Sequence, residues 1–146
     1  MSKLHEDITL FNTYCIDNNI QGFVRLNGTS DIDWQKLKIN NTSLFSNFPS
    51  ITFYDYTKDY TRESHFPNYH LTYSYNEKTD VKILPQLINK GNVAVVFNKL
   101  PIMWSGYEVI NGDLNDLRPK DKRGVIVGLV AKGRAKKDVS GFVKYV

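Results

Sequence analysis

Residues 124–138, GVIVGLVAKGRAKKD, give the clearest indication of the fold. Residues 125–131 are an unbroken apolar run of strand length, which is typical of a strand covered on both faces of a parallel sheet. The run is followed at once by Lys132, Arg134, Lys136 and Lys137. A buried strand that ends in cations has either an anion-binding site or a solvated exit at its carboxyl end, and both interpretations stay open at this point.

Other parts of the chain also have the composition of strands. Apolar, β-branched and aromatic residues dominate them, and turn-forming residues bound them. These segments are residues 22–31, 50–60, 68–80, 92–100 and, as a short strand or tail, 141–146. Residues 102–124 have no clear period and predict irregular structure, with a turn at Asn111 and Gly112.

Three segments have the signals of helices. Residues 3–19 repeat apolar side chains every three or four positions. Residues 31–40 predict a second helix, capped by Ser30 or Asp31. A third helix is expected to follow Thr79 or Asp80 and to end at Gly91; it is short or kinked because it contains Pro85.

Strands that alternate with helices predict an α/β fold with a mostly parallel sheet. We expect a single α/β domain over residues 1–146, with about five mostly parallel strands. The strands form either an open sheet or a partial β/α barrel. A chain of 146 residues is long enough to bury a core without disulfides or metals.

Charge and cysteine content narrow the functional classes. The formal net charge is +4 and the pI is about 9.1, which suits a nucleic-acid partner but also a basic protein that has none. Cys15 is the only cysteine, which excludes a disulfide within the chain and a cysteine-based metal site. We expect neither a metal nor a cofactor.

Membrane and export signals are also missing from the sequence. No apolar run approaches the roughly 20 residues that cross a bilayer, and the first residues, MSKLHEDITLF, lack the pattern of a signal peptide. We therefore expect a cytoplasmic protein without a membrane partner.

Polar and charged residues follow five of the predicted strands. In a parallel sheet these carboxyl ends share one edge, where the ligands of α/β proteins bind. Such an edge suits a phosphate, a nucleotide or a sugar, although solvated loops produce the same polarity at any single strand. The candidate ligand-binding residues are Arg25, Asn27, Asp31, Asp55, Lys58, Asn76, Asn98, Lys132 and Arg134.

Arg25 stands out because it lies inside an apolar run, next to Val24 and Leu26. An arginine on a covered strand needs a carboxylate partner, since an unpaired buried charge is costly. Asp55, on the adjacent predicted strand, is the candidate partner. A buried ion pair and a substrate-binding arginine both fit this pattern.

Two further patterns have a chemical interpretation. Residues 53–75 hold eight aromatic residues beside Lys58 and Arg62, a mixture that can stack unpaired bases, although strand alternation assigns about half of the rings to the core. Asp113 and Asp116 lie in a turn-rich segment whose spacing does not fit an EF-hand. A salt-bridged loop explains them better than a magnesium site.

The chain resembles a family of bacteriophage proteins of the gene-product-eighty-eight type. The similar blocks are residues 24–34, 48–62, 68–77, 92–101 and 109–143. The resemblance covers about residues 22–143 and implies a phage, prophage or mobile-element protein. Longer relatives resemble radical-SAM-like β/α barrels with a cysteine-rich N-terminal segment. This chain has one cysteine in total, so the resemblance supports no cluster chemistry and assigns no catalytic residue.

We therefore expect a phage or mobile-element accessory protein that binds a host protein or nucleic acid, for example to inhibit a host system, rather than an enzyme. The alternative is a small enzyme, or a nucleotide- or phosphate-binding remnant of a β/α barrel. A binding protein should expose a patch around residues 54–75 or along the basic segment. An enzyme remnant should have a pocket lined by Arg25, Asn27, Asp55 and Lys132.

Overall fold

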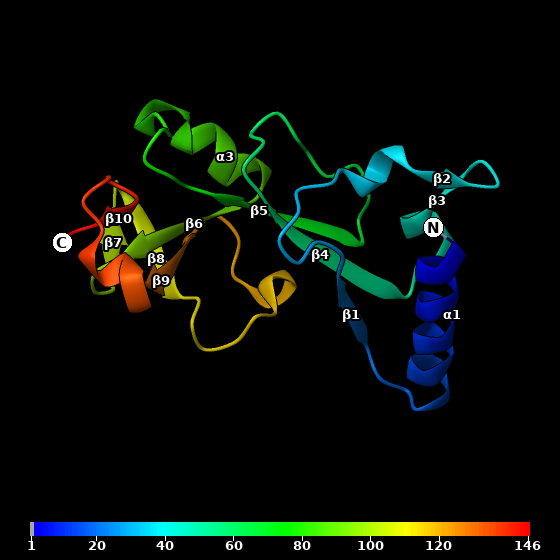
Figure 1. Cartoon of the computed structure of the whole chain (residues 1–146). Helices are drawn as coiled ribbons and strands as arrows, with labels where there is room; N and C mark the ends of the chain where they lie inside the picture. The colour runs from blue at the N-terminus through cyan, green and yellow to red at the C-terminus, as the bar shows by residue number, and fades with distance from the viewer. Residues whose placement is uncertain (1) are drawn as a thin grey trace. The chain divides into compact units, whose positions relative to one another are not determined.

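Residues 2–55 and 64–70 form one folded unit, and residues 56–63 and 71–146 form another. The computed structural model describes residues 2–146 (Figure 1). We call the unit that contains residues 64–70 the N-terminal unit and the unit that contains residues 71–146 the C-terminal unit, and we describe each by itself. The single domain expected from the sequence stays a prediction.

The N-terminal unit begins with α1 (Ser2–Asp17), where the apolar period predicted a helix. Ile8 and Cys15, on its inner face, are buried, and the helix packs beside β1 (Gly22–Arg25) (Figure 1). Gly22 allows this close approach, because a Cβ atom there would lie 3.0 Å from Cys15 Sγ. β1 pairs in parallel with the first part of β4 (Ile51–Thr57).

The helix predicted for residues 31–40 is wrong. Only η1 (Trp34–Lys36) forms there, a single 3-10 turn capped by Asp33 rather than by Ser30 or Asp31. The next residues pair as two short antiparallel strands, β2 (Lys38–Ile39) and β3 (Thr42–Ser43). Asn40 and Asn41 have φ angles of 52° and 64°, as a type I′ hairpin turn requires. The Asn-Asn pair therefore favours a hairpin over a continued helix.

A short helix replaces the loop expected before β4. α2 (Leu44–Asn47) is capped by the hydroxyl of Ser43, which accepts from the Ser46 N–H at 3.1 Å. The prediction that Leu44, Phe45 and Phe48 pack inward is confirmed, because all three are buried. The Phe45 ring stacks on Tyr69 with a centroid distance of 4.4 Å.

The C-terminal unit is built on parallel strands, as the unbroken apolar runs predicted. Along one edge of β6 (Asn92–Phe97) runs β5 (Tyr69–Ser74), and along the other runs β9 (Ile126–Val130). β8 (Tyr107–Asn111) pairs in parallel with the far side of β9. β10 (Val143–Lys144) pairs in parallel with the last two residues of β6.

The irregular structure predicted for residues 102–124 is partly wrong. These residues contain β8 and also β7 (Met103–Trp104), which is antiparallel to β8. None of the residues of these two strands is buried, so no apolar run marked them in the sequence. The same segment ends in a 3-10 turn, η3 (Arg118–Lys120).

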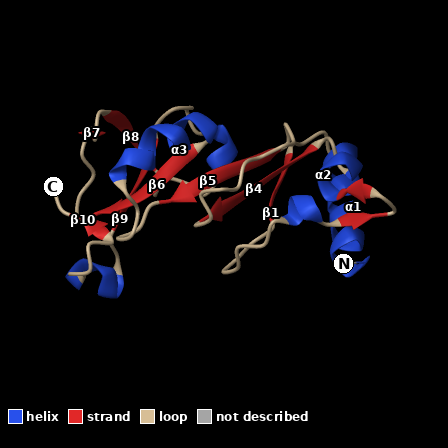
Figure 2. Cartoon of the chain, turned by 90° about the horizontal axis from the view of Figure 1, so that it is seen from above, coloured by secondary structure: helices blue, strands red, loops and turns tan. Residues whose placement is uncertain are grey.

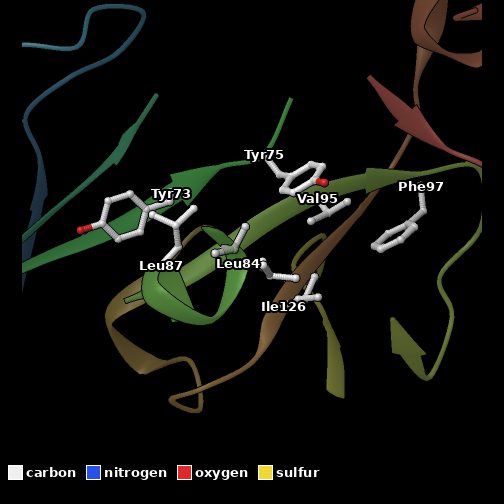
Figure 3. Close-up of a cluster of buried hydrophobic side chains, with 8 residues drawn as sticks. Tyr73, Tyr75, Leu84, Leu87, Val95, Phe97 and Ile126 are labelled. Carbon is white, nitrogen blue, oxygen red and sulfur yellow. The ribbon is translucent and has the colours of Figure 1, made fainter. Parts of the chain in front are cut away.

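One face of β5 and β6 is covered by η2 (Val81–Ile83) and α3 (Leu84–Lys90) (Figures 1 and 2). Asp80 caps this segment, and Pro85 lies in the first turn of α3, where its missing N–H costs no hydrogen bond. Leu84 and Leu87 point from α3 into the main buried cluster of the unit (Figure 3). The other members of that cluster are Tyr73, Tyr75, Val93, Val95, Phe97 and Ile126.

The structure confirms a mixed α/β fold with mostly parallel strands. The predicted regular alternation with helices does not form: strands outnumber helices within residues 2–146, and the connections that lead to β8, β9 and β10 contain no α-helix. The strand pairings of the same residues do not close a barrel. None of the helices that the structure describes is long and apolar enough to cross a membrane.

Candidate functional site

The carboxyl ends of the parallel strands in the C-terminal unit are marked by cations. Because β5, β6, β9 and β10 all run in the same direction, their carboxyl ends lie at one edge of the unit. We call the cations on and after these ends the carboxyl rim. They are Lys78 after β5, Lys99 after β6, Lys132, Arg134, Lys136 and Lys137 after β9, and Lys144 in β10. All except the half-buried Lys144 are exposed.

Hydrogen bonds hold the segments of the rim together. The N–H of Ala131 donates to the Phe97 carbonyl at 2.8 Å, and the N–H of Asn98 donates to the Lys144 carbonyl at 3.2 Å. The side chain of Asn98 accepts from the N–H of Val146 at 2.8 Å. Backbone and side-chain hydrogen bonds therefore connect the segments that follow β6, β9 and β10.

Lys132 has an acidic partner from a neighbouring strand end. Its Nζ lies 3.1 Å from Asp113 Oδ1, and the N–H of Val130 donates to Asp113 Oδ2 at 2.9 Å. The Val130 hydrogen bond, helped by Lys132, holds the pKa of Asp113 below its ordinary value. The ion pair between Lys132 and Asp113 thus links the ends of β8 and β9. Asp113 neutralises much of the charge of Lys132.

Arg134, Lys136 and Lys137 differ from Lys132. They lie together in η4 (Gly133–Lys137), a 3-10 segment directly after β9 (orange in Figure 1). Within residues 2–146, the ion pairs do not include any of the three. Three exposed cations without a carboxylate partner are therefore held in one turn of the chain.

A hollow of about 440 Å³ opens at the end of β5. Its walls come from the segment after β5, which includes Asn76 and Lys78, from Lys58, and from the turn of residues 138–142. Lys58 and Asn76, two of the residues predicted from the sequence, therefore line one site. A second hollow, of about 420 Å³, lies against the other part of the same turn, next to Lys137 and Tyr145.

A comparison with protein-family models matches residues 1–145 to the family Gene product 88, a phage-type family. The match covers nearly the whole chain. The chain belongs to the Gene product 88 family. Neither the curated proteins nor the solved structures provide a match. The resemblance to phage proteins is thus confirmed at the level of the family, and the chain is a phage-associated protein.

In this Gene product 88 protein, four of the predicted residues belong to the N-terminal unit. Arg25 is exposed and donates to the carbonyl oxygens of Asn27 at 2.9 Å and Gly28 at 3.3 Å. The sequence predicted that Arg25 is buried on a covered strand, and this prediction is wrong. Asp31 is also exposed, in the loop after β1.

Asn27 and Asp55 are buried and organise that loop. Asp55 is fully buried and accepts from the Asn27 N–H at 2.7 Å and from the Tyr69 hydroxyl at 2.8 Å. The Asn27 side chain donates to the Ile32 carbonyl and accepts from Trp34 Nε1 at 2.8 Å. These contacts give both residues a part in holding the loop after β1 in place.

The aromatic stretch of residues 53–75 is mostly interior. Phe53, Tyr54, Tyr69, Tyr73 and Tyr75 are all buried. Burial raises the pKa of Tyr73 to about 12, with a smaller contribution from Glu63. The exposed aromatic patch that the sequence predicted around residues 54–75 is therefore wrong for these five rings, which cannot stack bases in the folded protein.

The turn-rich loop after β8 is salt-bridged, as predicted. Arg118 is fully buried, donates to the Gly112 carbonyl at 3.1 Å and places Nε 3.3 Å from Asp121 Oδ2. Burial raises the pKa of Asp121, and Arg118 opposes that shift. Groups of three or more metal-ligating side chains suited to a metal ion do not occur among residues 2–146.

Sequence reasoning missed the turn of residues 138–142. Asp138 Oδ1 accepts from the Ser140 hydroxyl at 2.6 Å, and Oδ2 accepts from the Val143 N–H at 3.0 Å. Gly141 has a φ of 95°. The sequence Asp-Val-Ser-Gly carries this turn signal, because Asp and Ser side chains bond to backbone two residues on and Gly supplies positive φ.

Proposed function

We propose that this phage protein binds nucleic acid through its carboxyl rim. The observation that carries the proposal is the set of three exposed cations in η4, Arg134, Lys136 and Lys137, which have no carboxylate partner within the described residues. Cations that are not neutralised within the protein are the groups that contact phosphates and release counterions.

The distribution of charge supports this surface. The C-terminal unit has fifteen Lys and Arg against nine Asp and Glu, whereas the N-terminal unit has four against six. The positive net charge of the chain therefore comes from the unit that carries the rim. Clustering of cations on one surface of a unit is the electrostatic footprint of a nucleic-acid partner.

Two acidic groups near the rim, Asp113 and Asp138, oppose this field only weakly. Asp113 is bonded to Val130 and Lys132, and Asp138 is bonded to Ser140 and Val143. The Ser140 and Val143 donors hold the pKa of Asp138 below its ordinary value. Both carboxylates face donors of the protein itself, which leaves the η4 cations to face a ligand.

The test compares two variants with the same change in net charge. In the rim variant, Arg134, Lys136 and Lys137 are changed to Gln. In the control variant, Lys3, Lys36 and Lys38, which are exposed in the N-terminal unit, are changed to Gln. Affinity for a labelled oligonucleotide is measured by fluorescence anisotropy from about 50 to 200 mM salt.

The rim variant should bind at least about tenfold more weakly at the lower salt, and its slope of log K against log salt should be smaller by about 2, since each phosphate contact on a single strand contributes about 0.7. The control should keep the affinity and slope of the unchanged protein. An equal loss in both variants would assign the effect to net charge. If the unchanged protein binds no oligonucleotide at low salt, the proposal fails, and a pull-down from host extract with nuclease then tests for a protein partner.

A further inference from the structure

Two hollows lie on either side of the turn of residues 138–142. The turn is held in place by its own side chains: Asp138 accepts from Ser140 and Val143, and Ser140 Oγ accepts from the Phe142 N–H at 3.2 Å. Asp138 lines both hollows. The hollows are therefore neighbouring sites separated by a fixed wall.

The hollow next to Tyr145 has an apolar lining. Val139, Val143 and Tyr145 contribute to it, with Lys137 at its side. Tyr145 is 58% exposed, yet its hydroxyl donates to the Asp138 carbonyl at 2.9 Å. An aromatic ring that is open to solvent is suited to stacking with a base, because every base has a π face. The hydrogen bond restricts the ring before a base binds, which lowers the entropy that stacking costs.

The other hollow has a polar lining. Lys78 and Asn76 line it, and so does Ser140, whose hydroxyl hydrogen is donated to Asp138. Glu77 also lines it and partly offsets the charge of Lys78. Phe142, half-buried, adds a ring to the wall. The ammonium group of Lys78 and the amide of Asn76 are donors of the kind that bind phosphate and sugar oxygens.

We propose that the two hollows hold adjacent nucleotides of a single strand, with a base against Tyr145 and the neighbouring phosphate beside Lys78. This inference rests on the proposed nucleic-acid binding and adds its substrate class. Each hollow has a volume near the lower end of the range for ligand pockets. The bases of a duplex are stacked on one another and cannot enter such hollows, whereas an unpaired base can.

The experiment measures the affinity for a labelled single strand of about 12 nucleotides and for the duplex of the same sequence, by fluorescence anisotropy. Tyr145→Ala should weaken single-strand binding about tenfold, in line with the loss of one stacked base, and leave duplex binding unchanged. Tyr145→Phe keeps the ring and should retain most of the single-strand affinity. Circular dichroism melts check that each variant is folded.

The polar hollow is tested by a pair of opposite charge changes. Lys78→Gln should weaken single-strand binding and reduce its salt slope by about 0.7. Glu77→Gln should strengthen the same binding about twofold, because it removes a charge that opposes the phosphate.

The results separate the two proposals. If the Tyr145 and Lys78 variants weaken single-strand and duplex binding equally, or change neither, the hollows do not select single strands, while binding through η4 stands. If the unchanged protein binds neither probe, both proposals are overturned.

Discussion

The two units of the chain use polar residues at strand ends in different ways. In the N-terminal unit, Asn27 and Asp55 are buried and bonded to each other and to neighbouring side chains. In the C-terminal unit, Arg134, Lys136 and Lys137 are exposed at a strand end, and the ion pairs of the described residues do not include them. The same sequence pattern thus holds a loop in one unit and presents charge to solvent in the other.

The largest effect is expected in the N-terminal unit. Asp55→Ala should lower the free energy of unfolding by about 3 kcal/mol, because it leaves the Asn27 N–H and the Tyr69 hydroxyl buried without this acceptor. Urea unfolding followed by circular dichroism measures the change. Asp17→Ala, at an exposed acid of the same unit, is the control and should change stability by less than about 0.5 kcal/mol.

Oligonucleotide binding by the folded Asp55→Ala protein sharpens the comparison. We expect unchanged affinity, since the carboxyl rim belongs to the other unit. A folded variant with weaker binding would show that the N-terminal unit takes part in recognition, and the division of roles between the units would then be wrong.

A smaller effect is expected from a buried hydroxyl of the C-terminal unit. Tyr73 donates to the Arg62 carbonyl at 2.6 Å, and Lys90 Nζ donates to the same oxygen at 3.2 Å. Tyr73→Phe should cost about 1 kcal/mol, because Lys90 still satisfies that carbonyl. If the cost approaches that of Asp55→Ala, the C-terminal unit depends on buried polar contacts as much as the N-terminal unit does.

The pH dependence of Tyr73 has a defined sign. Its folded pKa of about 12 lies above the ordinary value of 10.0, so its contribution to stability is complete below pH 10 and is lost as the pH rises toward 12. The pKa values of Tyr60 and Tyr75 are also raised by burial, so ultraviolet titration of tyrosinate should show one fewer late-ionising tyrosine in Tyr73→Phe than in the unchanged protein.

The smallest effect concerns the loop after β8. Asp113 should titrate below its ordinary pKa and Asp121 above it. The Asp113 contribution is present above the ordinary pKa and is lost as the pH falls through the lowered value, whereas the Asp121 contribution is present at low pH and is lost as the pH rises through the raised value.

Carboxyl chemical shifts followed by NMR measure both titrations. Lys132→Gln should move the pKa of Asp113 back toward its ordinary value and leave Asp121 unchanged. The accompanying loss of stability should be small, because the Lys132 side chain is 75% exposed and its ion pair is screened by solvent. Equal shifts of both carboxyls would show that the loop responds as one charged cluster.

Continuous apolar runs made the parallel strands predictable. Residues 93–97 and 126–130 have no polar interruption, which is the pattern of strands covered on both faces. β8 was missed because its residues are only partly buried or exposed. The hairpin at Asn40 and Asn41 was missed because its turn chemistry overrides the helical appearance of the residues before it.

Strand ends could be listed from the sequence, but their burial could not. Asn27 and Lys132 look alike as polar residues after a strand, and only tertiary contacts show that one is buried and the other pairs with Asp113. The turn at Asp138 has a local signal in the sequence Asp-Val-Ser-Gly, but nothing in that signal places the turn beside the end of β5. Local patterns contain no information about which segments meet at the rim.

The pairing of β10 has a consequence for the order of events during synthesis. β9 occupies one edge of β6, β5 covers only residues 92–94 of the other edge, and β10 completes that edge at Val96 and Phe97. At translation rates of about 5–20 residues per second, residues 143–144 emerge from the ribosome a few seconds after β6 does. During that interval the carboxyl half of a central strand keeps an open edge, which is a template for pairing with another chain. The nascent protein therefore becomes safe from such pairing only when the segment that shapes the rim has been made.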